Sequence, residues 1–366
     1  MAQELEKGQI RMPASGSPAE NQPGASTPGA ARSDRETAAE QSEIAPELAE
    51  LADAAVFSER SRGTDAKIAS KADGDSFRAT FARYYSLTKP GVLYGNVLTA
   101  AAGFLLAAGV ARDFDGLLFL ATIIGTTLVI ASACVLNNVL DRDIDDRMER
   151  TKKRATVSGS IGVRNATVFS IVLGVLGLVI LIGWTNWLVV VTGLVGFFTY
   201  VVLYGMLSKR MSVHGTLVGS ISGAAPIFAG VVAVTGTVDM AAVLAFLAIF
   251  FWQMPEFYSI AVYRRDEYAR AGVPVITVVK GIPHAKVQIL LYTIAYAVSS
   301  VLLTPFGYTG WVYFGVMAVL GIWWIVIGVQ GFRATDDAAW ARRMFRFSLI
   351  IIMGYSLMVS VGPLLP

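Results

Sequence analysis

The chain has 366 residues, of which 54% are hydrophobic and only 16% are charged, and its mean hydropathy is +0.57. This composition excludes an ordinary soluble domain of this size and predicts several membrane spans of ~20 residues each. The formal net charge of +3 is small, and we expect no nucleic-acid partner. The single cysteine, Cys134, excludes an intrachain disulfide, and we interpret it as core packing.

The first part of the chain differs in composition from the rest. Residues 1–77 are rich in Ala, Glu, Ser, Pro and Gly and contain no apolar run long enough to span a bilayer. This composition predicts a disordered cytoplasmic extension, followed by a membrane domain over residues 78–366. We interpret the extension as dispensable, and docking of a partner is the alternative.

Apolar runs after residue 78 predict an all-α polytopic membrane protein. Each run is close to the length that crosses a hydrocarbon core as a helix. We expect nine transmembrane helices, at residues 91–109, 117–137, 164–184, 187–207, 215–235, 240–260, 288–306, 311–331 and 344–364.

The distribution of basic residues predicts the orientation. Lys and Arg are concentrated before the first run and in the loops after the even-numbered runs, with Arg112 as the exception. Positive loops mark the cytoplasmic side. The N-terminus is therefore expected in the cytoplasm and the C-terminus on the opposite side. Most acids lie in the same basic loops, so we expect the chemistry at the cytoplasmic face.

A ladder of polar side chains follows the second apolar run. Asn137, Asp141 and Asp145 are four residues apart, so on one helix they point the same way on successive turns. Carboxylate and amide oxygens suit a hard cation such as Mg²⁺, which also binds phosphate oxygens. We predict a catalytic and metal-binding site at this helix end; a solvated helix end with local ion pairs is the alternative.

Basic residues near this ladder are candidates for binding phosphate. Within the run that follows the ladder we favour Arg150 and Arg154, because Arg is suited to bidentate phosphate contacts. Lys209 and Arg210 end the fourth apolar run. We interpret these two primarily as positive-inside signals and secondarily as phosphate ligands.

A second acidic cluster follows the sixth apolar run. Glu256 comes directly after Pro255 and lies at membrane depth, where an unpaired carboxylate is costly. At helical spacing Glu256, Tyr263 and Glu267 share a face, and Asp266 lies one step around. We predict a second acidic site opposite the first; structural ion pairs with the neighbouring arginines are the alternative.

These motifs resemble the UbiA superfamily of intramembrane prenyltransferases, and within it the protoheme IX farnesyltransferase (heme O synthase) family. The resemblance runs from about Ser86 to the C-terminus. It rests on the segments Leu87–Pro90, Asn137–Asp145, Met148–Arg154, Lys209–Arg210, His214–Pro226, Trp252–Pro255 and Ala271–Pro274.

The resemblance implies nine helices around a central cavity that opens to the cytoplasmic side of the cell membrane. It implies transfer of a farnesyl group from farnesyl diphosphate to protoheme IX, giving heme O for terminal oxidases. Mg²⁺ would bridge Asn137, Asp141 and Asp145 to the diphosphate, with Asp266 holding a second ion. Surrounding membrane lipid and heme A synthase or oxidase assembly proteins are the other implied partners.

Two positions depart from the family pattern. The family usually has His where this chain has Glu256, and a Pro-Pro pair where Pro226 is followed by Ile227. The first departure puts heme positioning in question more than prenyl transfer. Two alternatives stay open: prenylation of another acceptor, such as 4-hydroxybenzoate or a quinone precursor, and a non-catalytic transporter or heme scaffold. A transporter would more typically show internal repeats and acids at mid-membrane.

Overall fold

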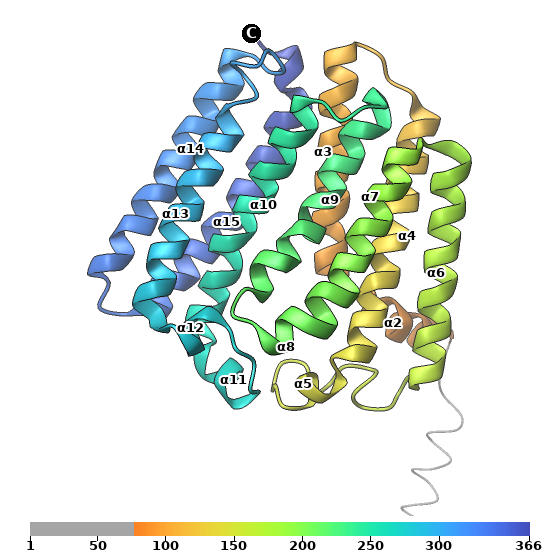
Figure 1. Ribbon diagram of the computed structural model, residues 1–366, viewed down its shortest axis with the longest axis vertical. Coiled ribbons are helices and arrows are strands. Elements are labelled where there is room, and N and C mark those ends of the chain that lie inside the picture. Colours follow the sequence, from red (N-terminus) through yellow and green to blue (C-terminus); the bar gives the residue numbers. More distant parts are fainter. Residues whose placement is uncertain (1–76) are drawn as a thin grey trace, which may run out of the picture. The chain divides into compact units, whose positions relative to one another are not determined.

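The computed structural model describes residues 77–366, and apart from Phe77 the predicted N-terminal extension lies outside the described residues. The described part is all-helical, as predicted (Figure 1). Its long helices are α3 (Pro90–Ala111), α4 (Gly116–Leu140), α6 (Val163–Trp184), α7 (Trp187–Phe198), α9 (Gly215–Thr235), α10 (Met240–Tyr263), α13 (Gly281–Val301), α14 (Trp311–Gln330) and α15 (Asp337–Val361).

Shorter elements connect these helices. Helix α7 continues as a π-helix, η1 (Thr199–Ser208), and ends in α8 (Lys209–Met211). The others are α2 (Phe77–Leu87), α5 (Arg142–Asp146), α11 (Arg265–Arg270), α12 (Ile276–Val279) and the 3₁₀ turns η2 (Gly331–Arg333) and η3 (Gly362–Leu364). Figure 1 shows α5, α8, α11 and α12 together at one end of the bundle, opposite the C-terminus.

Eight helices in the described part of the chain are long and apolar enough to cross a membrane. The expected seventh span forms α13, which has 21 residues but is not among the eight. Its first turns are polar, since they carry His284, Lys286 and Gln288. The count of nine spans stays a prediction. Helices α13 and α15 also begin earlier than expected, because their polar first turns extend beyond the apolar runs.

The outer surface of the bundle has the character of a lipid-facing surface. On α6 the large apolar side chains Val168, Ile171, Val175, Val179 and Ile182 are all more than half exposed. Their spacing of three or four residues places them on one face of the helix. A soluble protein does not leave so continuous an apolar stripe in water. The stripe therefore fits a helix whose outer face contacts lipid tails.

Polar caps fix where three of the spans begin. The side chain of Asp115 accepts hydrogen bonds from the backbone N–H groups at the start of α4, and Asn186 and Asp239 do the same for α7 and α10. A helix start leaves its first N–H groups without intrahelical partners, and a short acceptor side chain satisfies them. These caps all stand at the starts of helices whose opposite ends reach the candidate site.

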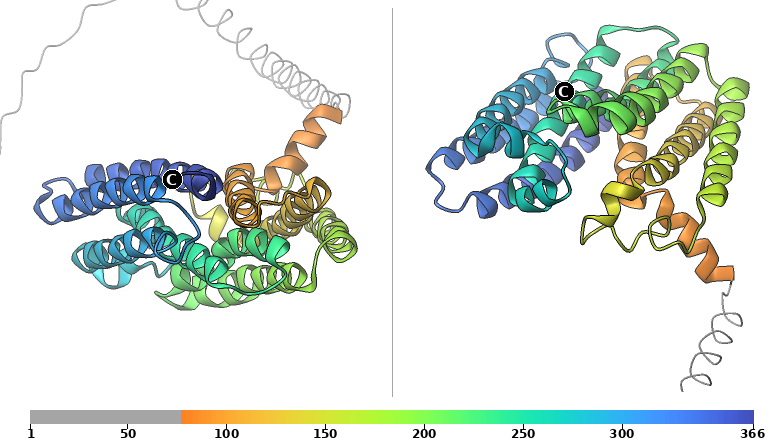
Figure 2. Two further views of the ribbon diagram at one scale, coloured as in Figure 1. Left: turned by 90° about the horizontal axis from the view of Figure 1, so that it is seen from above. Right: turned by 60° about the horizontal axis from the view of Figure 1, so that its bottom comes forward.

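Glycines bring α3 and α9 into direct backbone contact. A Cβ atom on Gly103 would overlap the carbonyl of Ile227, and one on Gly230 would overlap the backbone of Ala100 and Phe104. Small residues permit this close approach in membrane bundles. The contact lies near the middle of both helices, and Thr99, Pro226 and Ala229 in the same stretches line a cavity. Figure 2 shows the bundle in two further views.

Candidate active site

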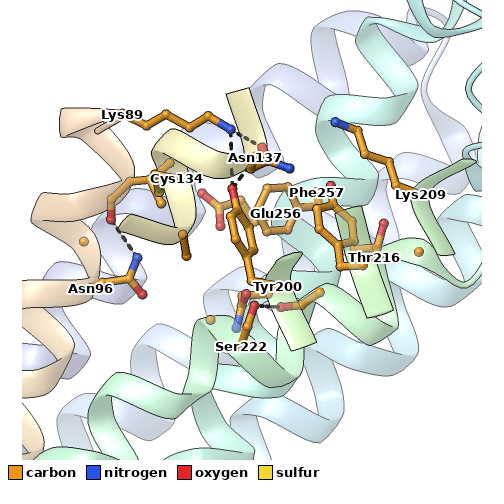
Figure 3. A pocket seen from close by; sticks show the side chains of 18 of the residues that line it. Lys89, Asn96, Cys134, Asn137, Tyr200, Lys209, Thr216, Ser222, Glu256 and Phe257 are labelled. Carbon is orange, nitrogen blue, oxygen red and sulfur yellow. Dashed lines mark hydrogen bonds between the residues drawn. The ribbon is translucent and has the colours of Figure 1, made fainter. Parts of the chain in front are cut away.

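A cavity of about 650 Å³ lies inside the bundle. Its wall is built from α3, α4, α7, η1, α9 and α10, with contributions from α15 and from the short segments at the basic end. Most of the wall is apolar, and Figure 3 draws some of the lining side chains, with Lys89, Asn137 and Glu256 among those labelled. A cavity of this size is in the range of small-molecule and cofactor sites.

The predicted ladder lines this cavity, although it is not one continuous helix. Helix α4 ends at Leu140, Asp141 has φ −87° and ψ 5°, and α5 begins at Arg142. The backbone hydrogen bonds from Asp141 to Asn137 (2.9 Å) and from Asp145 to Asp141 (2.8 Å) keep the four-residue spacing across the break. Asn137, Asp141 and Asp145 therefore all face the cavity and are buried.

Each member of the ladder has a cationic partner. Lys209 Nζ lies 2.5 Å from Asp141 Oδ2, and Arg154 Nη1 lies 2.5 Å from Asp145 Oδ2. The ammonium group of Lys89 donates to Asn137 Oδ1, which Tyr200 also contacts at 3.4 Å (Figure 3). Arg154 follows the ladder closely in the chain, whereas Lys89 and Lys209 lie 48 and 68 residues from their partners, and the fold brings them to the same wall.

Hydrogen bonds within the loop after α5 place Arg154. Its guanidinium also donates to Asn138 Oδ1 at 3.1 Å, and the amide of Asn138 donates to the carbonyl of Leu87 at 2.8 Å. Thr151 Oγ1 donates to the carbonyl of Asp145, and Thr156 Oγ1 to that of Asn138. These contacts hold the loop against the end of α4, so that Arg150 and Arg154 both line the cavity.

Lys89 lines the site, although the sequence did not predict it there. In the sequence it belongs only to a motif and to a charge pattern. It precedes Pro90, the first residue of α3, and adopts a left-handed backbone conformation with φ 54°. This conformation is uncommon for a residue with a side chain. It is associated here with an ammonium group that turns into the cavity, and burial lowers the pKa of Lys89 to about 8. The feature of the sequence that could have indicated this role is the position of the lysine directly before the first span.

Two tyrosines from η1 form another part of the wall that the sequence analysis did not assign. Tyr200 and Tyr204 stack with ring centroids 5.8 Å apart, and Lys209 Nζ lies 5.9 Å from the Tyr204 ring. π-Helical segments are rare and occur frequently at functional sites. No residue pattern distinguished this segment from the α-helix expected over 187–207.

Three predicted site residues do not line the cavity. Arg210 forms a bidentate pair with Asp143 at 2.7 Å for each contact, and this pair holds the pKa of Asp143 down at about 2. Asp266 is exposed, and Glu267 pairs with Arg264 at 2.9 Å. Their predicted roles as ligands stay untested predictions.

The shared face expected for the second acidic site is interrupted. Helix α10 ends at Tyr263, and Arg264, with φ −115° and ψ 18°, separates it from α11. Glu267 therefore does not continue the face that carries Glu256. Glu256 itself lines the cavity, as does Cys134, which is a buried free thiol.

The oxygen atoms of the ladder fit a hard cation. Asp141 Oδ1 is buried and has no hydrogen-bond partner among residues 77–366. An orphaned carboxylate oxygen in a buried site calls for an explanation, and an ion is one. In the described part of the chain no three His, Cys, Asp or Glu residues cluster as a metal site. The two carboxylates would therefore need the Asn137 amide and oxygen atoms of the ligand to complete the coordination of a cation.

Comparison with known proteins identifies relatives of this arrangement. Residues 96–350 match the model of the UbiA prenyltransferase family. Protoheme IX farnesyltransferase 2 from Chromobacterium violaceum is 46% identical over 282 residues, which cover 77% of this chain and 93% of that protein. A protoheme IX farnesyltransferase from Yersinia pseudotuberculosis is 44% identical over 279 residues, covering 76% and 94%.

Solved structures show the same fold at low sequence identity. A digeranylgeranylglyceryl phosphate synthase superposes with a TM-score of 0.66 at 20% identity, covering 77% of this chain and 98% of that one. A UbiA homologue from Archaeoglobus fulgidus, bound to GPP and Mg²⁺, superposes with a TM-score of 0.58 at 15% identity, covering 76% and 99%.

Proposed function

The chain belongs to the UbiA prenyltransferase family, and from that premise we propose that it transfers a farnesyl group from farnesyl diphosphate to a vinyl group of protoheme IX. The product is heme O. The observation that carries this choice of substrates is the 44–46% identity with protoheme IX farnesyltransferases over more than nine-tenths of their length.

Four cationic side chains in the cavity wall would hold the diphosphate. Lys89, Arg150, Arg154 and Lys209 all line the cavity and come from three separate segments. Their convergence on one wall gives a site for a compact, multiply charged anion. Three of these cations contact the ladder: Lys89 contacts the Asn137 amide, and Arg154 and Lys209 contact the two acids. Arrival of the diphosphate would exchange these contacts for phosphate contacts.

Asn137, Asp141 and Asp145 would hold Mg²⁺ in the loaded enzyme. A bound Mg²⁺ supplies charge neutralisation for the leaving diphosphate. Support comes from the unpartnered oxygen of Asp141 and from the archaeal UbiA homologue solved with GPP and Mg²⁺. Arg154 and Lys209 share the same task, since a fixed positive charge stabilises developing negative charge most effectively where water is excluded.

The apolar remainder of the cavity suits the prenyl chain and the porphyrin. Aromatic, aliphatic and small residues of α9, α10 and α15 line it, including Phe257, Ile352 and Gly223. These walls would exclude bulk water, which would otherwise capture the farnesyl cation before the acceptor does. Positive loops mark the cytoplasmic side, so we propose that the cavity opens at the basic end of the bundle and that this end lies on the cytoplasmic side of the cell membrane.

A single assay separates this function from the alternatives. Purified protein in detergent or liposomes is incubated with radiolabelled farnesyl diphosphate, Mg²⁺ and protoheme IX, and products are extracted and resolved by chromatography. Label that moves with heme O and release of pyrophosphate support the proposal. Label in a phenolic product when 4-hydroxybenzoate is supplied would assign another acceptor. Absence of pyrophosphate release would contradict a prenyltransferase of any kind.

A further inference from the structure

Glu256 differs from the other acids of the cavity in having no partner. Asp141 and Asp145 are each paired with a cation at 2.5 Å, whereas Glu256 lines the cavity with no hydrogen bond or ion pair within residues 77–366. It lies seven residues before the end of α10, inside a membrane span. A carboxyl group in such a place is costly, and such groups are usually retained for function.

The backbone that carries Glu256 is firmly held. One turn earlier, the Gln253 amide donates to the carbonyls of Ser220 at 3.1 Å and Ile249 at 3.2 Å. The Trp252 indole donates to the carbonyl of Ser348 at 2.9 Å. These bonds tie α10 to α9 and α15. The carboxyl of Glu256 is thus presented from a rigid wall, as a catalytic group requires.

Glu256 reaches the cavity from a different wall than the ladder. Helix α10 packs against α9, α13 and α15, whereas α4 packs mainly against α6 and α3. Figure 3 shows Glu256 within the cavity together with Tyr200 and Phe257. Lys89, Arg154 and Lys209 are paired with the ladder and not with Glu256, which leaves Glu256 for the acceptor and the second half of the reaction.

That second half releases a proton that needs an acceptor. The C1–O bond of farnesyl diphosphate breaks with its electron pair on pyrophosphate, and the vinyl π electrons form the new C–C bond. This leaves a cation on the inner vinyl carbon. A water molecule then forms a C–O bond to that carbon, and one of its protons must leave to give the neutral alcohol.

We propose that the Glu256 carboxylate is the general base that accepts this proton. The role rests on the proposed function. By hydrogen bonding to one water molecule, the carboxylate orients it towards the cation in a cavity that otherwise excludes water. Without this base the cation instead loses a proton from the neighbouring carbon to the released pyrophosphate, which gives a farnesylated heme that lacks the hydroxyl group and is lighter by one water.

The test compares products from the wild type, Glu256→Gln, Glu256→His and Glu149→Gln. Gln keeps the size of Glu but cannot accept the proton, whereas His can. Glu149 is an exposed acid outside the cavity, paired with Lys152, and provides the matched control. Each protein receives farnesyl diphosphate, Mg²⁺ and protoheme IX; pyrophosphate is quantified and the hemes are analysed by mass spectrometry.

We expect Glu256→Gln to form the hydroxylated product about a hundredfold more slowly, in line with the loss of a general base. Pyrophosphate release should continue, the dehydrated heme should accumulate, and Glu256→His and Glu149→Gln should keep the hydroxylated product. Wild-type proportions of hydroxylated product in Glu256→Gln would overturn the role of Glu256, as would its absence in Glu256→His while pyrophosphate release persists. If the wild type itself yields no farnesylated heme, the proposed function fails, and the role of Glu256 with it.

Discussion

The Asp141–Lys209 pair gives the sharpest test of the site. Asp141 is fully buried, and its Oδ2 atom lies 2.5 Å from Lys209 Nζ. At an effective dielectric constant of about 20, this separation corresponds to a gross attraction of about 7 kcal/mol. Asp141→Asn keeps the shape of the side chain and removes its charge. Lys209 would then be a largely buried cation without its carboxylate.

Removing one partner of a buried pair typically costs about 3–5 kcal/mol. We expect a value near the lower limit, because the Lys209 side chain is 18% exposed and lies against the Tyr204 ring. We also expect turnover to fall by about a thousandfold. The variant loses a charged oxygen that would help to hold Mg²⁺, and this ion would stabilise the negative charge on the leaving diphosphate. The double variant Asp141→Asn/Lys209→Met should recover most of the stability and none of the activity.

The assays are denaturant unfolding in detergent and pyrophosphate release with farnesyl diphosphate and protoheme IX. Asp143→Asn is the control, since it makes the same chemical change two residues further along the chain. Its pair with Arg210 is exposed, with side-chain exposures of 53% and 32%, and such pairs contribute at most about 1 kcal/mol. More than a tenth of wild-type turnover in Asp141→Asn, or equal losses in the two variants, would refute the reasoning.

Three further predictions follow from the cavity wall. Lys89→Met should raise the KM for farnesyl diphosphate about tenfold or more without unfolding the protein, because the ammonium group lines the site; an unchanged KM would exclude it as a ligand. Arg154→Gln should reduce turnover far more than Arg210→Gln, since only Arg154 faces the cavity; the reverse order, measured as kcat/KM, would place the diphosphate elsewhere. Gly230→Val should lower the free energy of unfolding by about 3 kcal/mol or more, because the valine side chain would overlap the α3 backbone at Ala100. An unchanged melting temperature in detergent would contradict that contact.

Much of the architecture was predictable because the membrane imposes simple rules on sequence. A helix that crosses lipid must be apolar for about 20 residues, so apolar runs located most of the helices. The predictions were less accurate where the segments were amphipathic. Helix α13 begins at Gly281, seven residues before the expected start, because its first turns carry polar residues and so lie outside the apolar run.

The residues of the candidate site were likewise predictable from the sequence only in part. The spacing of Asn137, Asp141 and Asp145 is local, and it placed all three on one face even though α4 ends between them. The contribution of Lys89 was not predictable from local spacing. It lies 48 residues from Asn137, and the two side chains meet only because α3 and α4 pack together.

Sequence by itself determined an all-helical membrane protein with a ladder of acidic and amide side chains at one helix end, because apolar length and four-residue spacing are properties of a single segment. The tertiary structure alone decided which charges share the cavity. Arg154 enters it and Arg210 does not; Glu256 enters it and Glu267 does not. Those distinctions depend on where a helix breaks and which neighbour each segment packs against, and the residue spacing within one segment determines neither.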